Sequence, residues 1–213
     1  QPGADATAER LRELDFEPLV APLLAIEPLE AALDLGGAGA LAYTSVHAVR
    51  PPPSGGADLP LFAVGAATAQ AALSAGYLDV HVGPADAAGL GDLIARSLPP
   101  GTEVLHPCAQ ERAGDIAAPL TQAGLILRPV PVYRSVAAPL SAAVEAARAQ
   151  AQIVLLHSPK GARALEAVLA VRPGPALRAL CLSRAVADAL DERNFSNVAY
   201  PALPNDTALL KLL

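Results

Sequence analysis

Methionine and tryptophan are absent from this chain, and aromatic side chains make up only 3% of its 213 residues. Hydrophobic residues nevertheless reach 53% of the chain, while charged residues account for 17%. This balance excludes a disordered chain, because enough apolar surface is present to form packed cores. At this length the chain forms one large domain or two domains of about 100 residues each.

Long apolar runs and a targeting segment are also missing. No stretch approaches the roughly 20 consecutive apolar residues that a membrane-spanning helix needs. No basic segment followed by an apolar one opens the chain, as a secretion signal would require. We therefore expect a cytoplasmic protein that has no membrane partner.

Cysteine is scarce, and potential metal ligands are scattered. Cys108 and Cys181 are the two cysteines, and we interpret both as packing residues, since a reducing compartment disfavours a bridge between them. We predict no metal site, because the histidines lack a partnering Cys, Asp or Glu at ligand spacing. These histidines are His47, His81, His106 and His157.

Positive charge is not in excess. The formal net charge is −6 at pH 7, so the composition offers no broad basic surface, and nucleic acid is not expected as a partner.

The chain does contain an internal repeat. Residues 43–49 and 61–69 recur in similar form at residues 156–162 and 180–187, so that Ser45 matches Ser158 and Gly65 matches Ser183. A further unit breaks this order, because residues 110–132 have their counterpart at residues 1–23, with Leu11 matching Leu120. The chain therefore starts in one domain, completes a second domain and returns to the first.

This order of repeats predicts the domain boundaries. We expect a discontinuous domain of residues 1–22 and 140–213, and an inserted domain of residues 28–131. Residues 21–29 and 128–139 are rich in Pro, Val and Leu, and we predict that they form a two-stranded hinge. Each domain would have five strands if a strand precedes Gln1, as one precedes the matching unit.

Short apolar runs alternate with Ala- and Leu-rich helical patterns along the chain. Continuous apolar strands that alternate with helices are typical of an α/β fold, in which parallel sheets are covered on both faces. The predicted strands are residues 38–44, 59–64, 80–82, 103–106, 153–157 and 179–182, and the predicted helices include 66–75, 89–97, 162–171 and 185–190. Residues 17–23 form a further apolar strand by their match to the unit at 110–132, and Asp5 and Thr7 are positioned to open the first helix.

Hydroxyl side chains gather at the strand-to-helix junctions. In open α/β sheets ligands bind beyond the carboxyl ends of the strands, where helix N-termini present free N–H groups and partial positive charge. We expect Ser45, Thr68, Ser158, Lys160 and Ser183 to surround one cleft between the domains. A small polyanion held largely by backbone amides would fit there, although each hydroxyl could equally serve only as a helix cap.

Five short motifs in this order resemble the uroporphyrinogen-III synthase family. They are Thr44-Ser45-x-x-Ala48-Val49, Val64-Gly65-x-x-Thr68-Ala69, Val132-Tyr133, Ser158-Pro159-x-Gly161 and Leu182-Ser183-x-x-Val186-Ala187. The resemblance implies two flavodoxin-like α/β domains and an enzyme that converts hydroxymethylbilane to uroporphyrinogen III. It also implies a reaction that loses water, inverts the last pyrrole ring and needs no cofactor or metal. A monomer is expected.

The resemblance further implies roles for individual residues. Tyr133 matches the family's tyrosine and is the candidate general acid, although a tyrosine in a Val-rich strand is often a core residue. Ser45, Thr68 and Ser158 match positions that border the substrate, whereas Val186 stands where many relatives have threonine. Ser183 or Arg184 could compensate for that threonine, and Lys160 is the best-placed cation. Arg112, Arg134 and Arg184 lie near predicted loops that could meet carboxylates.

Two other function classes stay open on architecture alone, because a fold does not fix a function. One is a two-domain protein that binds or senses a small ligand without catalysis. The other is a nucleotide-sugar transferase, which is disfavoured because no glycine-rich phosphate loop is present.

Overall fold

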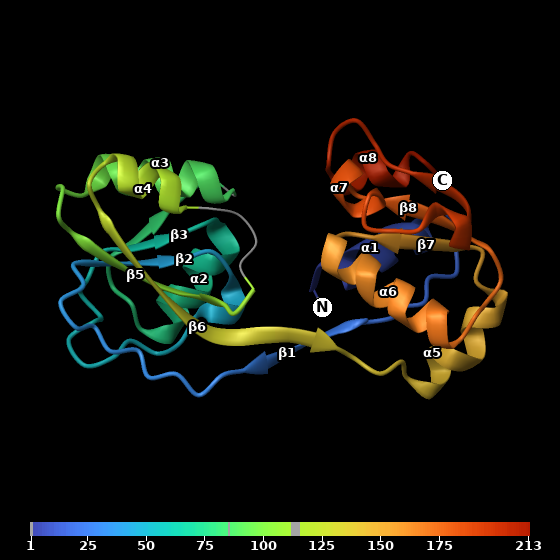
Figure 1. The fold of residues 1–213 in the computed structure, drawn as a ribbon, viewed down its shortest axis with the longest axis horizontal. Coiled ribbons are helices and arrows are strands. Elements are labelled where there is room, and N and C mark those ends of the chain that lie inside the picture. Colours follow the sequence, from blue (N-terminus) through green and yellow to red (C-terminus); the bar gives the residue numbers. More distant parts are fainter. Residues whose placement is uncertain (1, 85, 112–115) are drawn as a thin grey trace. The chain divides into compact units, whose positions relative to one another are not determined.

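The computed structural model describes residues 2–84, 86–111 and 116–213, and it divides into two compact units (Figure 1). Unit 1 comprises Gln1–Ala25 and Val136–Leu213, and unit 2 comprises Ile26–Ser135. The chain thus enters unit 1, completes unit 2 and returns to unit 1.

A six-stranded sheet forms the centre of unit 2, with strand order β1-β6-β5-β2-β3-β4. Strand β2 pairs in parallel with β3 and β5, β3 pairs in parallel with β4, and β5 pairs in parallel with β6. The elements are β1 (Leu24–Pro28), β2 (Ala40–Tyr43), η1 (Val46–Ala48), β3 (Leu61–Ala63), α2 (Ala66–Ala75), β4 (Val80–Val82), α3 (Ala87–Ser97), β5 (Glu103–Ala109), α4 (Ala117–Gln122) and β6 (Ile126–Ala137).

Helices cover both faces of this sheet, as the apolar strands predict. Along β2, Leu41 and Tyr43 join a core cluster that includes residues of α2, while Ala40 and Ala42 join a cluster that includes residues of α3 and α4. Because successive side chains point to opposite faces, a strand that is apolar at every position is buried on both sides. Figure 1 shows α3 and α4 together on one side of this sheet.

Unit 1 contains a smaller parallel sheet with the order β7-β8-β9. Its core combines β7, α6, β8, α7 and β9, with Ala179 and Cys181 fully buried. The elements are α1 (Pro2–Glu13), α5 (Ala142–Ala147), η2 (Arg148–Gln150), β7 (Ile153–Leu156), α6 (Pro159–Val171), β8 (Leu177–Cys181), α7 (Arg184–Ala187), η3 (Glu192–Asn194), β9 (Phe195–Ala199) and α8 (Asp206–Leu210).

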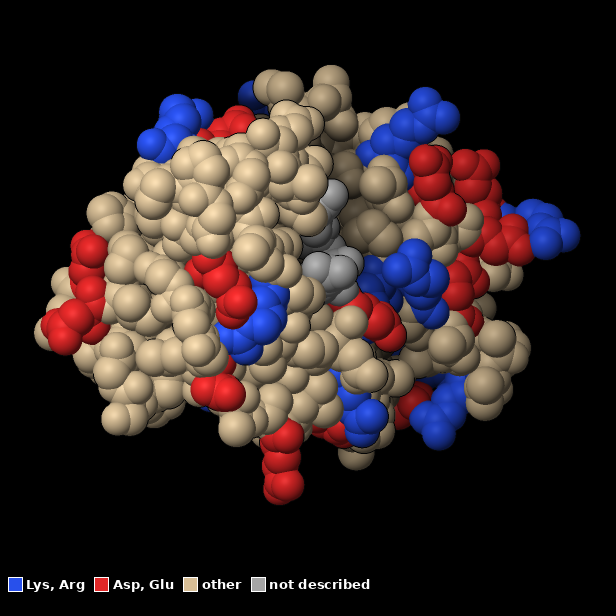
Figure 2. Space-filling view, turned by 60° about the vertical axis from the view of Figure 1, so that its left-hand side comes forward, with Lys and Arg blue, Asp and Glu red and all other residues tan. Residues whose placement is uncertain are grey.

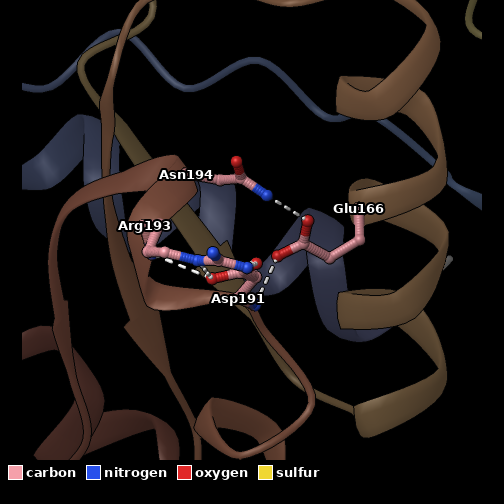
Figure 3. Close-up of polar contacts among 4 residues, drawn as sticks. All are labelled: Glu166, Asp191, Arg193 and Asn194. Atoms are coloured by element: carbon pink, nitrogen blue, oxygen red, sulfur yellow. Dashed lines mark hydrogen bonds and ion pairs between the residues drawn. The ribbon is translucent and has the colours of Figure 1, made fainter.

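A polar network joins α6 to the turn before β9 (Figure 3). Glu166 accepts hydrogen bonds from the backbone N–H of Asp191 and from the side-chain amide of Asn194, both at 2.7 Å. Arg193 hydrogen bonds to Asp191 and lowers the pKa of that carboxyl group to about 2. The network therefore fixes the turn that leads the chain into β9.

The predicted α/β class with parallel sheets in two similar units is confirmed, and several element bounds agree closely with the structure. Predicted residues 66–75 and 80–82 are the observed α2 and β4. The two crossing segments include β1 and β6, which are neighbours in one sheet. In the part of the chain that the structure describes, no helix is long and apolar enough to cross a membrane.

Three expectations about unit 1 are wrong. Helix α1 already includes Asp5 and Thr7, so neither residue opens it, and Thr7 instead donates a 2.7 Å hydrogen bond to Asp206. Residues 17–23 were expected to form a strand, yet residues 16–23 have no regular secondary structure. This sheet has three strands rather than the five expected, because neither residues 17–23 nor a further strand extends it in the described residues. A strand before Gln1 stays a prediction.

The repeat is visible in backbone detail. Asp15 ends α1 with φ 62°, and Gly124 follows α4 with φ 72°. The next residue closes the same hydrogen bond in each unit, from Phe16 N–H to the Leu11 carbonyl at 3.0 Å and from Leu125 N–H to the Leu120 carbonyl at 2.9 Å. Equivalent residues thus end equivalent helices with the same left-handed turn.

Beside β7, the repeat leaves a difference between the units. Strand β2 is buried at all four positions, whereas Ile153, Val154 and Leu155 of β7 are only half-buried. A cavity of about 610 Å³ lies against β7, between α1 and the irregular residues 16–23. Unit 1 therefore buries a more apolar strand less completely than unit 2 does.

Candidate active site at the carboxyl ends of the strands

The predicted site residues fall into two groups, one in each unit. Ser45, Thr68 and Tyr133 belong to unit 2, and Ser158, Lys160 and Ser183 belong to unit 1. Five of them follow a strand along the chain, and Tyr133 is the last residue of β6 that pairs with β5. We call these groups the unit-2 edge and the unit-1 edge.

Ser45 follows β2 and begins the short helix η1 at the unit-2 edge. Its Oγ accepts a hydrogen bond from the N–H of His47 at 3.2 Å. The residue before it, Thr44, has its hydroxyl 3.1 Å from Nε2 of the buried His106 on β5. Ser45 thus caps a helix, which was the simpler of its two predicted roles.

Thr68 lies in the first turn of α2, which begins after β3, and only 4% of its surface is exposed. Val186, its counterpart in unit 1, is 2% exposed in the equivalent first turn of α7. Valine fills this position without a hydroxyl group, so the fold needs the shape of the side chain more than its polarity. Thr68 is therefore less open to a ligand than its position in the sequence suggests.

Tyr133 owes its orientation to an irregularity in β6. Cys108 of β5 pairs with Pro131, but the next residue, Ala109, pairs with Tyr133, so Val132 is an extra residue. Val132 and Tyr133 are consecutive and both buried, whereas Pro131 and Arg134 on either side are exposed. This is the effect of a β-bulge, which breaks the alternation of side chains. The bulge turns Tyr133 inward.

His47 and Arg50 complete the surroundings of Tyr133, and neither was predicted as a site residue. The ring centroids of His47 and Tyr133 are 5.8 Å apart, in an edge-to-face arrangement. The Arg50 guanidinium group donates to the carbonyls of His47, Val49 and Val132, each at 2.9 Å. The signal in the sequence was weak, because the contact to Val132 spans 82 residues.

At the unit-1 edge, Ser158 caps the 13-residue helix α6. Its Oγ accepts from the N–H of Gly161 at 3.0 Å, and Pro159 occupies the first turn. Lys160 follows in that first turn and is half-buried. The N-terminus of α6 carries a partial positive charge, and Lys160 adds a cationic side chain in the same turn.

Ser183 occupies the N-cap position of α7, but its side chain makes no capping hydrogen bond. The alternative that its hydroxyl only caps the helix therefore does not apply to Ser183, and this hydroxyl is not committed to the helix that it precedes. Among the junction serines, Ser183 is the one that most readily fits a role in binding.

The unit-1 edge also carries a carboxylate that sequence analysis missed. Asp206, at the start of α8, lies 3.2 Å from Nε2 of His157, which directly follows β7. Its other oxygen accepts from Thr7 and lies 4.0 Å from Arg10. The side chains of α1, α8 and the end of β7 thus meet at one carboxylate.

Most other predicted cations are engaged locally. Arg134 forms an ion pair with Glu27 at 2.8 Å, and Arg184 lies 3.6 Å from Asp188 on its own helix. Arg112 lies outside the described residues. On the face drawn in Figure 2, Lys and Arg side chains lie beside Asp and Glu side chains rather than in one continuous basic area.

Within the described ranges, no group of three or more His, Cys, Asp or Glu side chains is arranged to hold a metal ion. Both cysteines are buried, which agrees with their interpretation as packing residues.

Comparison with known proteins agrees with this architecture. A family model described as "Uroporphyrinogen-III synthase HemD" matches residues 5–211. No curated protein sequence matches the chain significantly. Two solved structures have a similar fold, and at their level of sequence identity the likeness concerns the fold alone.

The first of these structures is uroporphyrinogen-III synthetase from Helicobacter pylori 26695, with a TM-score of 0.68 and 19% identity, covering 92% of this chain and 93% of that chain. The second is a mutant uroporphyrinogen III synthase from the extremely thermophilic bacterium Thermus thermophilus. It has a TM-score of 0.53 and 19% identity, and covers 99% of this chain and 93% of that chain.

Proposed function

The chain belongs to the uroporphyrinogen-III synthase family, and from that premise we propose that it cyclises hydroxymethylbilane to uroporphyrinogen III. The reaction expels water and inverts the last pyrrole ring, so the enzyme is a cyclising lyase of tetrapyrrole biosynthesis. The observation that carries the proposal is the match of the family model over residues 5–211, together with two strand edges that bear hydroxyl groups and helix N-termini.

The substrate carries eight carboxylates, and the site must hold them on a chain whose net charge is −6. Backbone N–H groups at helix N-termini bind carboxylates without adding a basic surface. We assign substrate binding to Ser45 and Thr68 at the unit-2 edge and to Ser158, Lys160 and Ser183 at the unit-1 edge.

Tyr133 is the proposed general acid. Its phenol donates a proton to the departing hydroxyl group, which leaves as water. The pyrrole ring that carried the hydroxymethyl group gives up its N–H proton, which replaces the proton lost by the phenol, and becomes an azafulvene electrophile. The substituted carbon of the last ring then attacks to give a spiro intermediate, and fragmentation and reclosure invert that ring. General acid catalysis contributes about 10²–10⁴-fold, whereas holding the chain folded for the attack is the larger task.

The product isomer tests the proposed activity. Hydroxymethylbilane supplied to the protein should yield the type III isomer at a rate proportional to protein concentration. Uncatalysed closure occurs without inversion and gives type I. Type I product alone would overturn the proposal and favour a binding or sensor protein that does not transform its ligand.

Replacing Tyr133 with phenylalanine tests the acid. We expect Tyr133→Phe to lower kcat by about 10²-fold or more, because the proton donor is lost while the ring is kept. Tyr77→Phe is the matched control, since Tyr77 has its hydroxyl 2.9 Å from that of Tyr43 in the core of the same unit. The control should lose stability, by about 1–2 kcal/mol, and retain kcat. Unchanged turnover in Tyr133→Phe would remove this residue from the mechanism.

We also propose that the protein acts as a monomer in the cytoplasm. Sedimentation of the purified chain over a wide concentration range tests the first point, and fractionation of cells tests the second.

A further inference from the structure

The bulge in β6 places a buried carbonyl group, that of Val132, where it accepts hydrogen bonds from two different segments of the chain. Val132 is the extra residue and is fully buried, so β5 has no residue directly opposite it. A buried carbonyl without a donor would cost about 1–3 kcal/mol. Two donors satisfy this one, the N–H of Leu29 and Nη2 of Arg50, both at 2.9 Å.

That carbonyl belongs to the peptide group that carries Tyr133. The carbonyl of Val132 and the N–H of Tyr133 lie in one rigid plane. A donor that holds this carbonyl therefore also holds the backbone nitrogen and Cα of Tyr133. On the other side of Tyr133, its own carbonyl accepts from the N–H of Gln110 at 2.8 Å. The backbone around Tyr133 is therefore anchored at two successive peptide groups.

The same guanidinium group also anchors the ring that packs on Tyr133. Nη1 of Arg50 donates to the carbonyls of His47 and Val49, which lie at η1. His47 in turn presents its imidazole to the Tyr133 ring at a centroid distance of 5.8 Å. One planar group thus bonds to the strand that carries the phenol and to the turn that carries its neighbour.

From these contacts we propose that Arg50 is the positioning residue for Tyr133. Its forked, rigid group reaches both segments at once, which the single ammonium group of lysine does not reproduce. Arg50 does not take part in the chemistry. It holds the bulge and η1 at a fixed separation, so that the phenol keeps one orientation. Only the expected effect of Arg50 on kcat rests on the proposed function.

The kinetic test uses Arg50→Lys in the full chain. We expect kcat to fall by about 10–100-fold, because a displacement of about 1 Å in a catalytic group costs up to 10²-fold. KM should stay within about threefold, because binding groups at other strands are untouched. In the double variant with Tyr133→Phe, the two losses should not multiply, since both act through one phenol. Multiplying losses would overturn the proposal.

A second readout needs no substrate. With tyrosines labelled at their ring carbons, the Tyr133 resonance is assigned from its absence in Tyr133→Phe. In Arg50→Lys this resonance should shift or broaden, and amide hydrogen exchange at Gln110 should accelerate relative to amides of α3. An unchanged resonance would overturn the proposal even if kcat falls. If wild-type protein makes no type III isomer, the function fails while this spectroscopic test still decides the role of Arg50.

Arg128→Lys is the matched control. Arg128 also donates to two backbone carbonyls, those of Asp34 and Leu35, and it pairs with Glu103 at the start of β5. This arginine lies near the opposite ends of the same strands. Its replacement should lower the thermal midpoint while leaving kcat and the Tyr133 resonance unchanged. Equal effects of both replacements on kcat and on the resonance would reduce Arg50 to a structural residue.

Discussion

At the scale of single residues, Thr68 and Val186 occupy equivalent buried positions in the two units and differ by one hydroxyl group. Both side chains occupy the first turn of a helix that follows a strand, and both are almost fully buried. Unit 1 folds with valine there, which shows that the hydroxyl group is not required for this packing. We explain the Thr68 hydroxyl by the proposed substrate binding, for which it must reach the ligand from a residue that is only 4% exposed.

Thr68→Val tests this explanation. The replacement removes one hydrogen-bonding group and keeps the branched shape, so the free energy of unfolding should change little, because Val186 fills the equivalent position in unit 1. KM should rise by about two- to tenfold, the effect of one hydrogen bond, while kcat changes less. Steady-state assays and urea unfolding measure the two quantities. An unchanged KM would mean that Thr68 serves only the core.

Buried thiol and phenol groups make the free energy of unfolding depend on pH in the alkaline range. Burial raises the pKa of the Cys181 thiol from 9.0 to about 11, and burial also raises the pKa of Tyr43 and of Tyr77, which share a hydrogen bond. The folded chain thus holds these protons more tightly than the unfolded chain does. The part of this stabilisation that comes from Cys181 is complete below about pH 9 and is lost as the pH rises through about 11.

Urea unfolding between pH 8 and pH 11 measures this dependence. The free energy of unfolding should fall across the range, and it should fall less steeply in Cys181→Ala, which lacks one of the protons. The same burial should make native Cys181 react with thiol reagents more slowly than the unfolded chain does. Equal slopes for wild type and Cys181→Ala would contradict the assignment.

Residue roles were predictable from the sequence where they depend on near neighbours. Ser45 and Ser158 stand between an apolar run and a helical pattern, and both are caps. The contact of Arg50 with Val132 leaves no local pattern, because the partners are 82 residues apart. The same holds for the bulge, which depends on how β5 and β6 pair and not on the residues of β6 alone.

At the scale of elements, Ser158 and Ser183 occupy the same position with different bonding. Ser158 accepts from the N–H of Gly161, whereas the Ser183 side chain makes no capping bond. Ser158→Ala should therefore lower the free energy of unfolding by about 1 kcal/mol. Ser183→Ala should change it by a few tenths of a kcal/mol at most, like an ordinary surface substitution.

The kinetic effects of these two replacements should be ordered the other way. Because the Ser183 hydroxyl is not used by its helix, Ser183→Ala should raise KM, and the loss should appear without a change in thermal midpoint. Calorimetry and assays on both variants provide the comparison. If Ser183→Ala is as destabilising as Ser158→Ala, its hydroxyl has a structural partner, and the assignment to binding is wrong.

Element type followed from the sequence where apolar periodicity and length agreed, as for α2 and β4. It failed for residues 17–23, whose composition matches the strand in the other unit. A strand forms only where a neighbouring strand accepts and donates hydrogen bonds, and in the described residues this segment lies across a cavity from β7. Composition alone does not reveal whether that neighbour is present.

At the scale of the whole molecule, the two units differ in how completely they bury the apolar surface of their sheets. Unit 2 is one continuous stretch, with two core clusters and a sheet covered on both faces. Unit 1 is assembled from two separate stretches around a three-stranded sheet, and part of β7 stays exposed to a cavity. Apolar surface left unburied gives up about 25 cal/mol per Å², so unit 1 should be the less stable of the two.

Excising residues 26–135 tests this ranking. The fragment should fold alone and unfold in one cooperative transition, because its core contacts lie within that stretch. In the full chain, hydrogen exchange should be slower for β2 and β5 than for β7. A fragment that stays unfolded, or equal protection in both sheets, would show that the units are stabilised jointly.

The discontinuous path of the chain was predictable because the repeat appears out of order in the sequence. Matched positions such as Leu11 and Leu120, which close the same hydrogen bond, show that the two halves share backbone detail as well as composition. The placement of the site residues within each unit followed from the rule for parallel sheets. Their detailed surroundings required the tertiary contacts of Arg50, His47 and Asp206.

The extra residue in β6 also limits which changes in chain length the protein tolerates. Deleting Val132 would remove the bulge and let Pro131 and Tyr133 pair with consecutive residues of β5, whereas inserting one amino acid beside Val132 would shift Tyr133 by one position and turn the phenol to the opposite face of the strand. A chain with such an insertion would keep every proposed catalytic and binding residue type, yet we expect it to be inactive, because the number of residues along the strand sets the direction of the phenol.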